Sequence, residues 1–224
     1  MQPELIEAVS HNDAYSKVIS AIVEADEQAY VKSHIVIPGL IYGIASGTVA
    51  NAGIQETLSA RISNLILAAL DRGRLGMVGD GQAIWPNIHI DDVVDLILRV
   101  LDVQLSISPI GEHGRREYYF ATNGEHRWYD LSKAIGDAFT HAELARASQL
   151  EPSSFSDEEL TQYMGSVEMG QQMRHNIRCR SNHGVQLGWR PIRTSEDMFS
   201  SIPLQLDAII KTLLDKQQRP PGPM

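Results

Sequence analysis

Two short, uninterrupted apolar runs most constrain what this chain can fold into. The first is HIVIP at residues 34–38, and the second is EYYFAT at residues 117–122. Strands that are apolar on both faces are typical of a parallel sheet covered by helices on both sides. Because each run is flanked by segments with helical spacing, this order of elements predicts an α/β fold with parallel strands.

Apolar residues recurring every three or four positions predict the helices. They are expected over residues 12–29, 57–70, 91–102 and 128–139, with one more from residue 156 and a last one starting within residues 194–197. Asp91 or Asp92 is placed to cap the third helix, and Ser156 with Glu159 forms a capping box. Pro203 is expected to kink the last helix or to delay its start.

Charge and composition exclude several classes of protein. The formal net charge of −9 argues against a nucleic-acid partner, because phosphate binding needs a basic face. Cys179 is the only cysteine, so no intramolecular disulfide can form, which fits a reducing compartment. No apolar run approaches the roughly 20 residues of a membrane span, and the first residues lack a signal-peptide pattern. We therefore expect a cytoplasmic protein with no membrane partner, and the His and Cys spacing indicates no metal site.

Three segments, taken in order, resemble a known family. They are VIPGLIYG, RGRLGMVGDGQAIWPNIHIDDVVDLILRVLD and YYFATNGEHRWYDLSKAIGDAF. The trio is similar to extended short-chain dehydrogenase/reductases, the NAD-dependent epimerase/dehydratase family. The resemblance implies a partial Rossmann-like parallel sheet with a substrate-binding lobe. Residues 1–215 would be the C-terminal part of that fold, without its Gly-rich nucleotide-binding half, and residues 216–224 a disordered tail.

The resemblance also implies a cofactor, NAD or NADP. It places Pro38, Gly39 and Leu40 against the nicotinamide ring, where glycine permits close approach of the backbone. The family's G-x-x-G-x-x-G turn, which holds the pyrophosphate at a helix N-terminus, has no counterpart here. The glycines of residues 76–81 precede Trp85 and Pro86, which oppose a helix, so that segment is interpreted as a turn between strands. Binding of the cofactor by this chain is therefore expected to be weak.

The catalytic pair of the family is a Tyr and a Lys four residues apart on one helix. The corresponding helix offers Tyr15 and Lys17, which are only two residues apart, and Asp13 stands four residues before Lys17. Tyr15 and Lys17 are the candidate catalytic residues. The alternative is that Tyr15 is a core or surface aromatic residue.

Tyr42, Trp85 and His89 are the candidate substrate-binding residues. For Tyr42 and Trp85, core packing is an equal alternative. For His89, the alternative is that the His-x-x-Asp stretch locks a loop at the start of a helix.

Three functions follow from this sequence. The family implies an NAD(P)-dependent oxidoreductase or epimerase that acts on a small carbonyl, alcohol or sugar-like molecule, weakly active or inactive as this chain alone. The second is a non-catalytic binding or scaffold protein that pairs with a full-length relative, and the third is a cofactor-independent isomerase that uses His89 or Tyr42. Because two buried strands leave sheet edges uncovered, a homo-oligomer or a complex with a relative is also expected.

Overall fold

The computed structural model describes residues 14–106, 113–144 and 151–218. They form a mixed α/β structure with short parallel sheets, as the sequence predicts.

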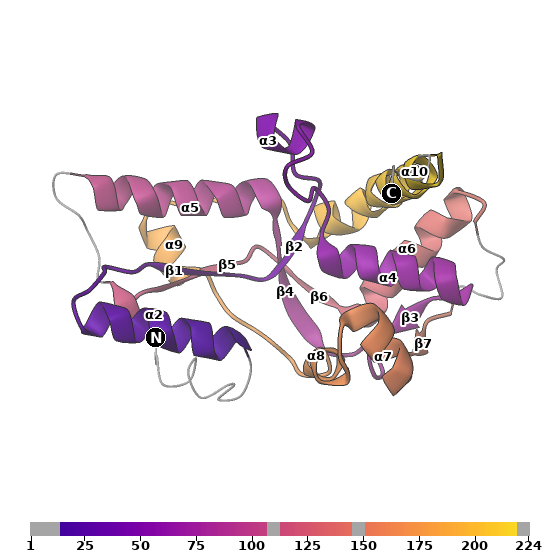
Figure 1. Cartoon of the computed structure of the whole chain (residues 1–224), viewed down its shortest axis with the longest axis horizontal. Coiled ribbons are helices and arrows are strands. Elements are labelled where there is room, and N and C mark those ends of the chain that lie inside the picture. Colours follow the sequence, from indigo (N-terminus) through magenta and orange to yellow (C-terminus); the bar gives the residue numbers. More distant parts are fainter. Residues whose placement is uncertain (1–13, 107–112, 145–150, 219–224) are drawn as a thin grey trace, which may run out of the picture.

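Two parallel strands form the centre of a three-layered unit. β1 (Ile35–Pro38) pairs with β5 (Tyr118–Ala121), in the two apolar runs predicted to be strands. α2 (Ala14–Glu27) lies on one side of the pair and α5 (Ile90–Leu105) on the other (Figure 1).

The apolar side chains of this pair alternate between the two faces. Ile35 and Tyr118 pack with Val23 of α2. Tyr119 and Ala121 pack in the cluster that holds Val93, Leu96 and Val100 of α5. Strand periodicity thus explains why both faces of the pair are apolar and covered.

The chain changes its pairing partner at Gly39. β1 ends at Pro38, and β2 (Leu40–Tyr42) continues in parallel with β4 (Ile84–His89). β6 (Glu125–Arg127) pairs with the other end of β4 in the antiparallel direction. A Cβ on Gly39 would lie 2.6 Å from the carbonyl oxygen of Pro86, so only glycine lets these backbones approach this closely.

Helices around a second, larger core make up most of the rest of the described chain. Its main helices are α4 (Ala60–Arg72), α6 (Trp128–His141), α7 (Asp157–Met164), α8 (Val167–Gln172) and α10 (Ser195–Gln218). The smaller elements of the described chain are α3 (Thr48–Asn51), β3 (Gly76–Met77), η1 (Gly114–Arg116), β7 (Ser153–Ser154) and α9 (Asn182–Gln186). β3 is parallel to β7, whereas α9 packs against β5 and η1 against α2. Trp128, Leu131 and Ile202 are among the fully buried residues of this core.

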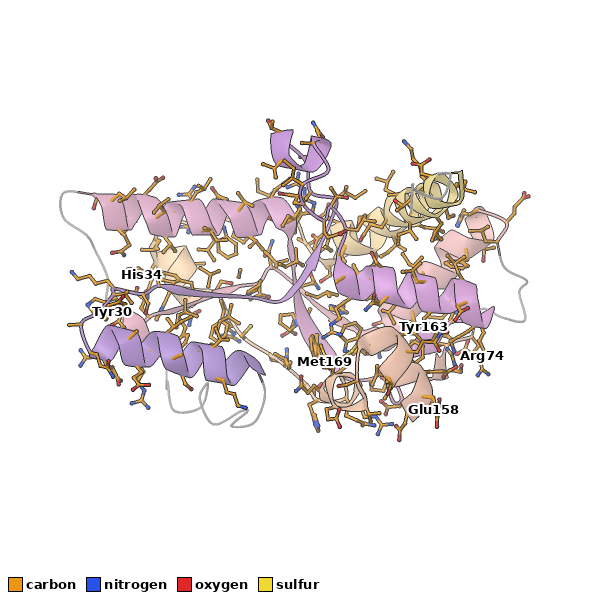
Figure 2. All side chains as sticks on the ribbon, viewed as in Figure 1. Tyr30, His34, Arg74, Glu158, Tyr163 and Met169 are labelled. Atoms are coloured by element: carbon orange, nitrogen blue, oxygen red, sulfur yellow. The ribbon has the colours of Figure 1, made fainter. Side chains whose placement is uncertain are left out.

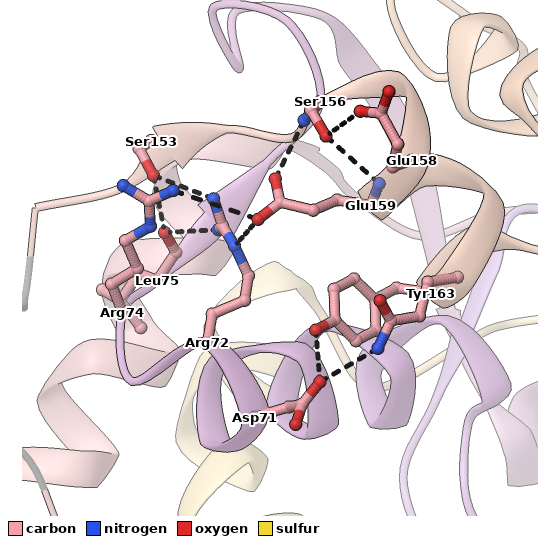
Figure 3. Close-up of polar contacts among 10 residues, drawn as sticks. Asp71, Arg72, Arg74, Leu75, Ser153, Ser156, Glu158, Glu159 and Tyr163 are labelled. Atoms are coloured by element: carbon pink, nitrogen blue, oxygen red, sulfur yellow. Dashed lines mark hydrogen bonds and ion pairs between the residues drawn. The ribbon is translucent and has the colours of Figure 1, made fainter.

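A buried arginine joins α4 to α7 (Figure 3). Arg72 donates to Glu159 over 2.7 Å and to the carbonyl oxygen of Leu75 over 3.1 Å, and only 4% of its side chain is exposed. Glu159 also accepts from the backbone N–H of Ser156, and Ser156 Oγ accepts from the N–H of Glu159. The predicted capping box is confirmed, and its glutamate also holds the guanidinium group.

Two expectations for the helix ends need correction, and the predicted start of the last helix is confirmed. α5 is capped by His89, whose Nδ1 accepts from the N–H of Asp91, and not by Asp91 or Asp92. α10 begins at Ser195 with Pro203 inside it, so the proline does not delay the start. The same helix reaches Gln218, three residues into the predicted tail, and residues 219–224 lie outside the described residues.

Candidate functional site

A cleft of about 520 Å³ opens at the carboxyl end of β5. One wall is the loop of residues 122–125, and the other comes from residues 178–181 and from Trp189 to Pro191. In open α/β sheets, ligands bind outside the carboxyl ends of parallel strands. The cleft therefore occupies a position suited to a ligand.

The cleft carries more positive than negative charge. Arg178, Arg180 and Arg190 line it together with Glu125 as the one carboxylate, which gives 3 − 1 = +2. Arg178 donates to both carboxylate oxygens of Glu125, over 2.9 and 2.7 Å, and holds the pKa of that carboxyl below its usual value. Arg190 donates to backbone carbonyl oxygens, while Arg180 is exposed. This arrangement suits an anionic group, because guanidinium groups bind carboxylates and phosphates well.

Cys179 also lines the cleft. Burial raises the pKa of its thiol to about 11, so the thiol stays protonated at neutral pH. A protonated thiol is a poor nucleophile, and the cysteine acts here as a partly buried apolar side chain.

The predicted cofactor contacts lie at the junction of β1 and β2. Pro38 is exposed, but Leu40 is only 6% exposed and packs in the larger core. The space next to Gly39 is taken by the main chain of Pro86. The close approach of the Gly39 backbone to β4 is therefore enough to explain the glycine. Of the three residues, only Pro38 is exposed to solvent.

Tyr42 and His89 lie together at the end of the β2–β4 pair. Their ring centroids are 5.1 Å apart in an edge-to-face arrangement. Tyr42 is fully buried, its hydroxyl donates to the carbonyl oxygen of Thr194 over 2.7 Å, and burial raises the pKa of that hydroxyl. His89 caps α5, and burial lowers the pKa of its imidazole. Both side chains are held by the protein's own backbone.

Trp85 lies apart from Tyr42 and His89. It lies toward the other end of β4, where its indole N–H donates to the carbonyl oxygen of His175 over 2.9 Å. Its ring contacts Trp128, with centroids 5.2 Å apart. The three predicted substrate contacts therefore do not form one site in this structure.

Asp92 joins the wall of the cleft to α5, a role that sequence reasoning missed. Its two carboxylate oxygens accept from the N–H groups of Ile192 and Arg193, over 3.2 and 3.1 Å. The backbone carbonyl of Asp92 accepts from the indole of Trp189 over 3.0 Å. The His-x-x-Asp stretch marks Asp92 as a polar residue at the start of a helix. It could not reveal the hydrogen-bond partners, which are about a hundred residues away in the sequence.

The candidate catalytic residues lie on α2. Lys17 is exposed, and the side chain of Tyr15 lies outside the described residues. At about 100° per residue, side chains two positions apart on a helix point to different sides. The backbone therefore does not bring Tyr15 and Lys17 to one face.

The residues present do not fit the pyrophosphate of a dinucleotide. β3 leads through a turn into β4, so no helix begins after the glycines of residues 76–81. A Cβ on Gly76 would meet the ring of Phe155, and one on Gly81 would meet Met77 and Tyr129. These glycines make room for the protein's own side chains. The glycines of residues 76–81 thus form no strand–glycine turn–helix cradle.

Metal binding and membrane insertion find no support in the described ranges. There, no three His, Cys, Asp or Glu side chains are placed to hold a metal ion together. None of the helices described combines the length and the apolar character that crossing a bilayer requires.

The chain is similar to known proteins over part of their length. Residues 9–110 match the model of the NAD dependent epimerase/dehydratase family. An oxidase of Acremonium sp, UcsJ, is 27% identical over 128 residues, which cover 54% of this chain and 35% of that protein.

Solved structures share the fold. The dTDP-glucose 4,6-dehydratase DesIV of Streptomyces venezuelae was solved with NAD and TYD bound. It matches with a TM-score of 0.56 and 19% sequence identity, and the match covers 87% of this chain and 50% of DesIV. The UDP-glucose 4-epimerase of Thermotoga maritima, solved with UDP-glucose, matches with a TM-score of 0.52 and 17% sequence identity. This match covers 89% of this chain and 52% of the epimerase. The chain thus spans about half the length of these structures and about a third of the curated relative. Residues 9–110 are thus similar to the NAD dependent epimerase/dehydratase family, in line with the resemblance carried by the motifs, and the chain shares the Rossmann-like α/β fold of these structures.

Proposed function

We propose that this chain supplies the substrate-binding part of an NAD(P)-dependent oxidoreductase or epimerase that acts on a small carbonyl, alcohol or sugar-like molecule. The observation that supports it most is the arginine-lined cleft at the carboxyl end of β5, in a chain whose residues 9–110 match this family's model. The similar structures include a dTDP-glucose 4,6-dehydratase and a UDP-glucose 4-epimerase solved with UDP-glucose. The diphosphate of such a nucleotide sugar is anionic, and the cleft's excess of guanidinium groups suits an anionic group.

A screen for thermal stabilisation tests the cleft. We expect small phosphorylated or carboxylated sugars to raise the melting temperature, and their uncharged counterparts to leave it unchanged. Arg180→Gln should remove the effect, because the guanidinium of Arg180 is exposed in the cleft. Lys211→Gln, a neutralised exposed cation on α10, should keep it. Equal stabilisation of all three proteins would contradict the proposed role of the cleft.

By itself, this chain is expected to bind the cofactor weakly. Because the glycines of residues 76–81 form no pyrophosphate cradle, we expect NAD(H) and NADP(H) to bind no tighter than about millimolar, ~4 kcal/mol. Titration calorimetry on the full chain measures this directly. Micromolar affinity would show that a cradle exists that the described residues do not reveal.

A non-catalytic binding or scaffold protein is the second candidate. It is favoured by the spacing of Tyr15 and Lys17 and by the burial of Tyr42. In that case the anionic ligand would stabilise the chain, but no absorbance change from NADH would appear when cofactor, ligand and a full-length relative are combined. A cofactor-independent isomerase is supported less, because the hydroxyl of Tyr42 already donates to the backbone of Thr194.

A further inference from the structure

An ion pair joins the two walls of the cleft. Arg178 donates through Nε to one carboxylate oxygen of Glu125 over 2.9 Å and through Nη2 to the other over 2.7 Å. The arginine comes from the irregular backbone between α8 and α9, and the glutamate is the first residue of β6. Two parallel bonds between a guanidinium group and a carboxylate make a strong and well-oriented pair. The pair therefore holds one wall of the cleft against the other.

Glu125 belongs to the more firmly held of the two walls. Its backbone pairs with that of Pro86 in the β4–β6 ladder. Its carbonyl oxygen accepts from the hydroxyl of Ser195 over 2.9 Å. Any opening of the cleft at the ion pair must therefore come from the side of the arginine.

The arginine belongs to a short segment that is held at both ends, residues 178–180, here called the strap. Before the strap, the N–H of Ile177 donates to the carbonyl oxygen of Ile84 over 2.9 Å. After it, the hydroxyl of Ser181 accepts from the N–H of Thr122 over 3.1 Å and donates to the carbonyl oxygen of the same residue over 2.9 Å. Between these anchors, the ion pair ties the strap to the opposite wall. Breaking the pair would thus loosen the strap without detaching its ends.

The ion pair is accessible to an incoming ligand. The exposed fraction is 63% for the side chain of Arg178 and 34% for that of Glu125. The hydrogen bonds from Arg178, together with the charge of Arg180, hold the pKa of the Glu125 carboxyl below its usual value, so this group is an anion at neutral pH. An anionic ligand therefore meets a guanidinium group that already holds an anion. Because an ion pair exposed to this degree contributes little to stability, the ligand can take the place of the carboxylate.

We propose that the pair of Arg178 and Glu125 is a latch, which keeps the strap against the loop of residues 122–125 until an anionic group replaces the carboxylate on Arg178. This inference rests on the proposed function, because the group that opens the latch is the anion for which the cleft is suited. The latch lowers the affinity for that anion, since only the fraction of the protein with an open latch can bind it.

The reactivity of Cys179 toward iodoacetamide tests the latch without any ligand. Cys179 lies in the strap and is the only cysteine of the sequence, so the full chain carries its own reporter. We expect Glu125→Gln and Arg178→Gln each to speed its alkylation by about fivefold, because each breaks the pair. Charge alone would act in opposite directions, since loss of the carboxylate lowers the pKa of the thiol and loss of the guanidinium group raises it.

Arg127→Gln is the matched control for this measurement. Arg127 forms the same two-bonded pair with Asp130 at the start of α6, over 2.8 and 3.0 Å, but neither residue lines the cleft. Its alkylation rate should equal that of the unmodified sequence. Unchanged rates in both latch variants would overturn the proposal. Faster alkylation in Glu125→Gln with slower alkylation in Arg178→Gln would overturn it as well, because that pattern is the effect of charge alone.

Titration calorimetry with glucose 6-phosphate tests the step in which an anion opens the latch. We expect Glu125→Gln to bind this probe about fivefold more tightly than the unmodified chain, and most of the gain should vanish in an Arg178→Gln background. An equal gain in both backgrounds would mean simple charge repulsion and would overturn the latch. Weaker binding in Glu125→Gln would also overturn it, because Glu125 would then orient Arg178 for the ligand.

The two measurements separate failure of the latch from failure of the proposed function. If glucose 6-phosphate binds and Arg180→Gln abolishes binding, but neither latch variant changes alkylation or affinity, the latch is wrong and the role of the cleft stands. If none of these proteins binds the probe, the anion-binding role of the cleft is wrong, and the opening step of the latch is wrong with it.

Discussion

At the scale of single residues, the side chains that most resemble catalytic groups are bound to the protein itself. Tyr42 donates to a backbone carbonyl, His89 caps a helix, and Asp92 accepts two backbone N–H groups. Each bond satisfies a buried or half-buried polar group that would otherwise destabilise the fold. The His-x-x-Asp stretch is therefore best interpreted as a device that fixes the cleft wall to α5.

Asp92→Asn should destabilise the chain by about 1–3 kcal/mol, because one carboxylate oxygen becomes an amide N–H₂ facing a backbone N–H. Asp91→Asn is the matched control. Its carboxylate is 54% exposed and contacts Arg193 over 3.2 Å, so the loss should stay below about 1 kcal/mol. Urea unfolding of both variants measures the difference. Equal stability of the two would mean that Asp92 is not a structural clamp.

His126 should make the chain sensitive to mild acid. Burial lowers the pKa of its imidazole from 6.5 to about 4 in the folded state. Between these two values the unfolded chain binds a proton that the folded chain does not, so stability falls as the pH falls through this window. The loss attributable to His126 is about 3 kcal/mol, and His34 and His89, whose pKa values are also lowered by burial, act in the same direction.

Unfolding free energies of His126→Gln between pH 7 and pH 4 check this. The variant should be less stable at pH 7, since the ring contacts Trp128 and Asn87, but its stability should change less with pH. His141→Gln, at an exposed position on α6, should keep the steep dependence. An unchanged slope in His126→Gln would contradict the role of burial.

At the scale of elements, local patterns predicted what local physics determines. The runs at residues 34–38 and 117–122 became β1 and β5, and helical spacing located α2, α4, α5, α6 and α10 to within a few residues. Tertiary contacts determined the rest. Nothing within residues 34–43 shows that β1 pairs with β5 while β2 pairs with β4.

The candidate site could be predicted even less well from sequence. Its walls come from residues 122–125 and 178–191, which are more than fifty positions apart. They meet because α9 packs against β5 and because Arg178 pairs with Glu125 across the cleft. The three arginines are visible in the sequence, but isolated cations on a chain of net charge −9 gave no signal of a site.

Gly39→Val should act through the strand junction. The new Cβ would lie 2.6 Å from the carbonyl oxygen of Pro86, so β2 and β4 must separate. Overpacking of this kind costs about 1–3 kcal/mol, whereas the exposed neighbour should tolerate Pro38→Ala with a smaller loss. Melting temperature and ligand affinity should fall together in Gly39→Val. Lost affinity with unchanged stability would instead indicate that the glycine faces a ligand.

At the scale of the whole molecule, the described chain contains a large helical core and a smaller layered unit. Tyr30 and His34 lie toward one end of the molecule, and Arg74 and Glu158 lie toward the other (Figure 2). The segment from β1 to β2 passes through both parts, because Val36 and Ile41 pack in the smaller core and Leu40 in the larger one. Unfolding of either part would therefore remove packing contacts of this segment.

Unfolding of the two parts should therefore be cooperative. The chain has three tryptophans, of which Trp189 is buried in the smaller core and Trp128 in the larger. A Trp85→Phe/Trp128→Phe variant reports on the smaller core by fluorescence, and a Trp85→Phe/Trp189→Phe variant reports on the larger. Within each variant, the urea midpoints from fluorescence and from far-UV circular dichroism should coincide. If Trp189 fluorescence changes at a lower urea concentration than the dichroism of the same variant, the layered unit opens on its own, and the β1–β2 segment does not couple the two cores.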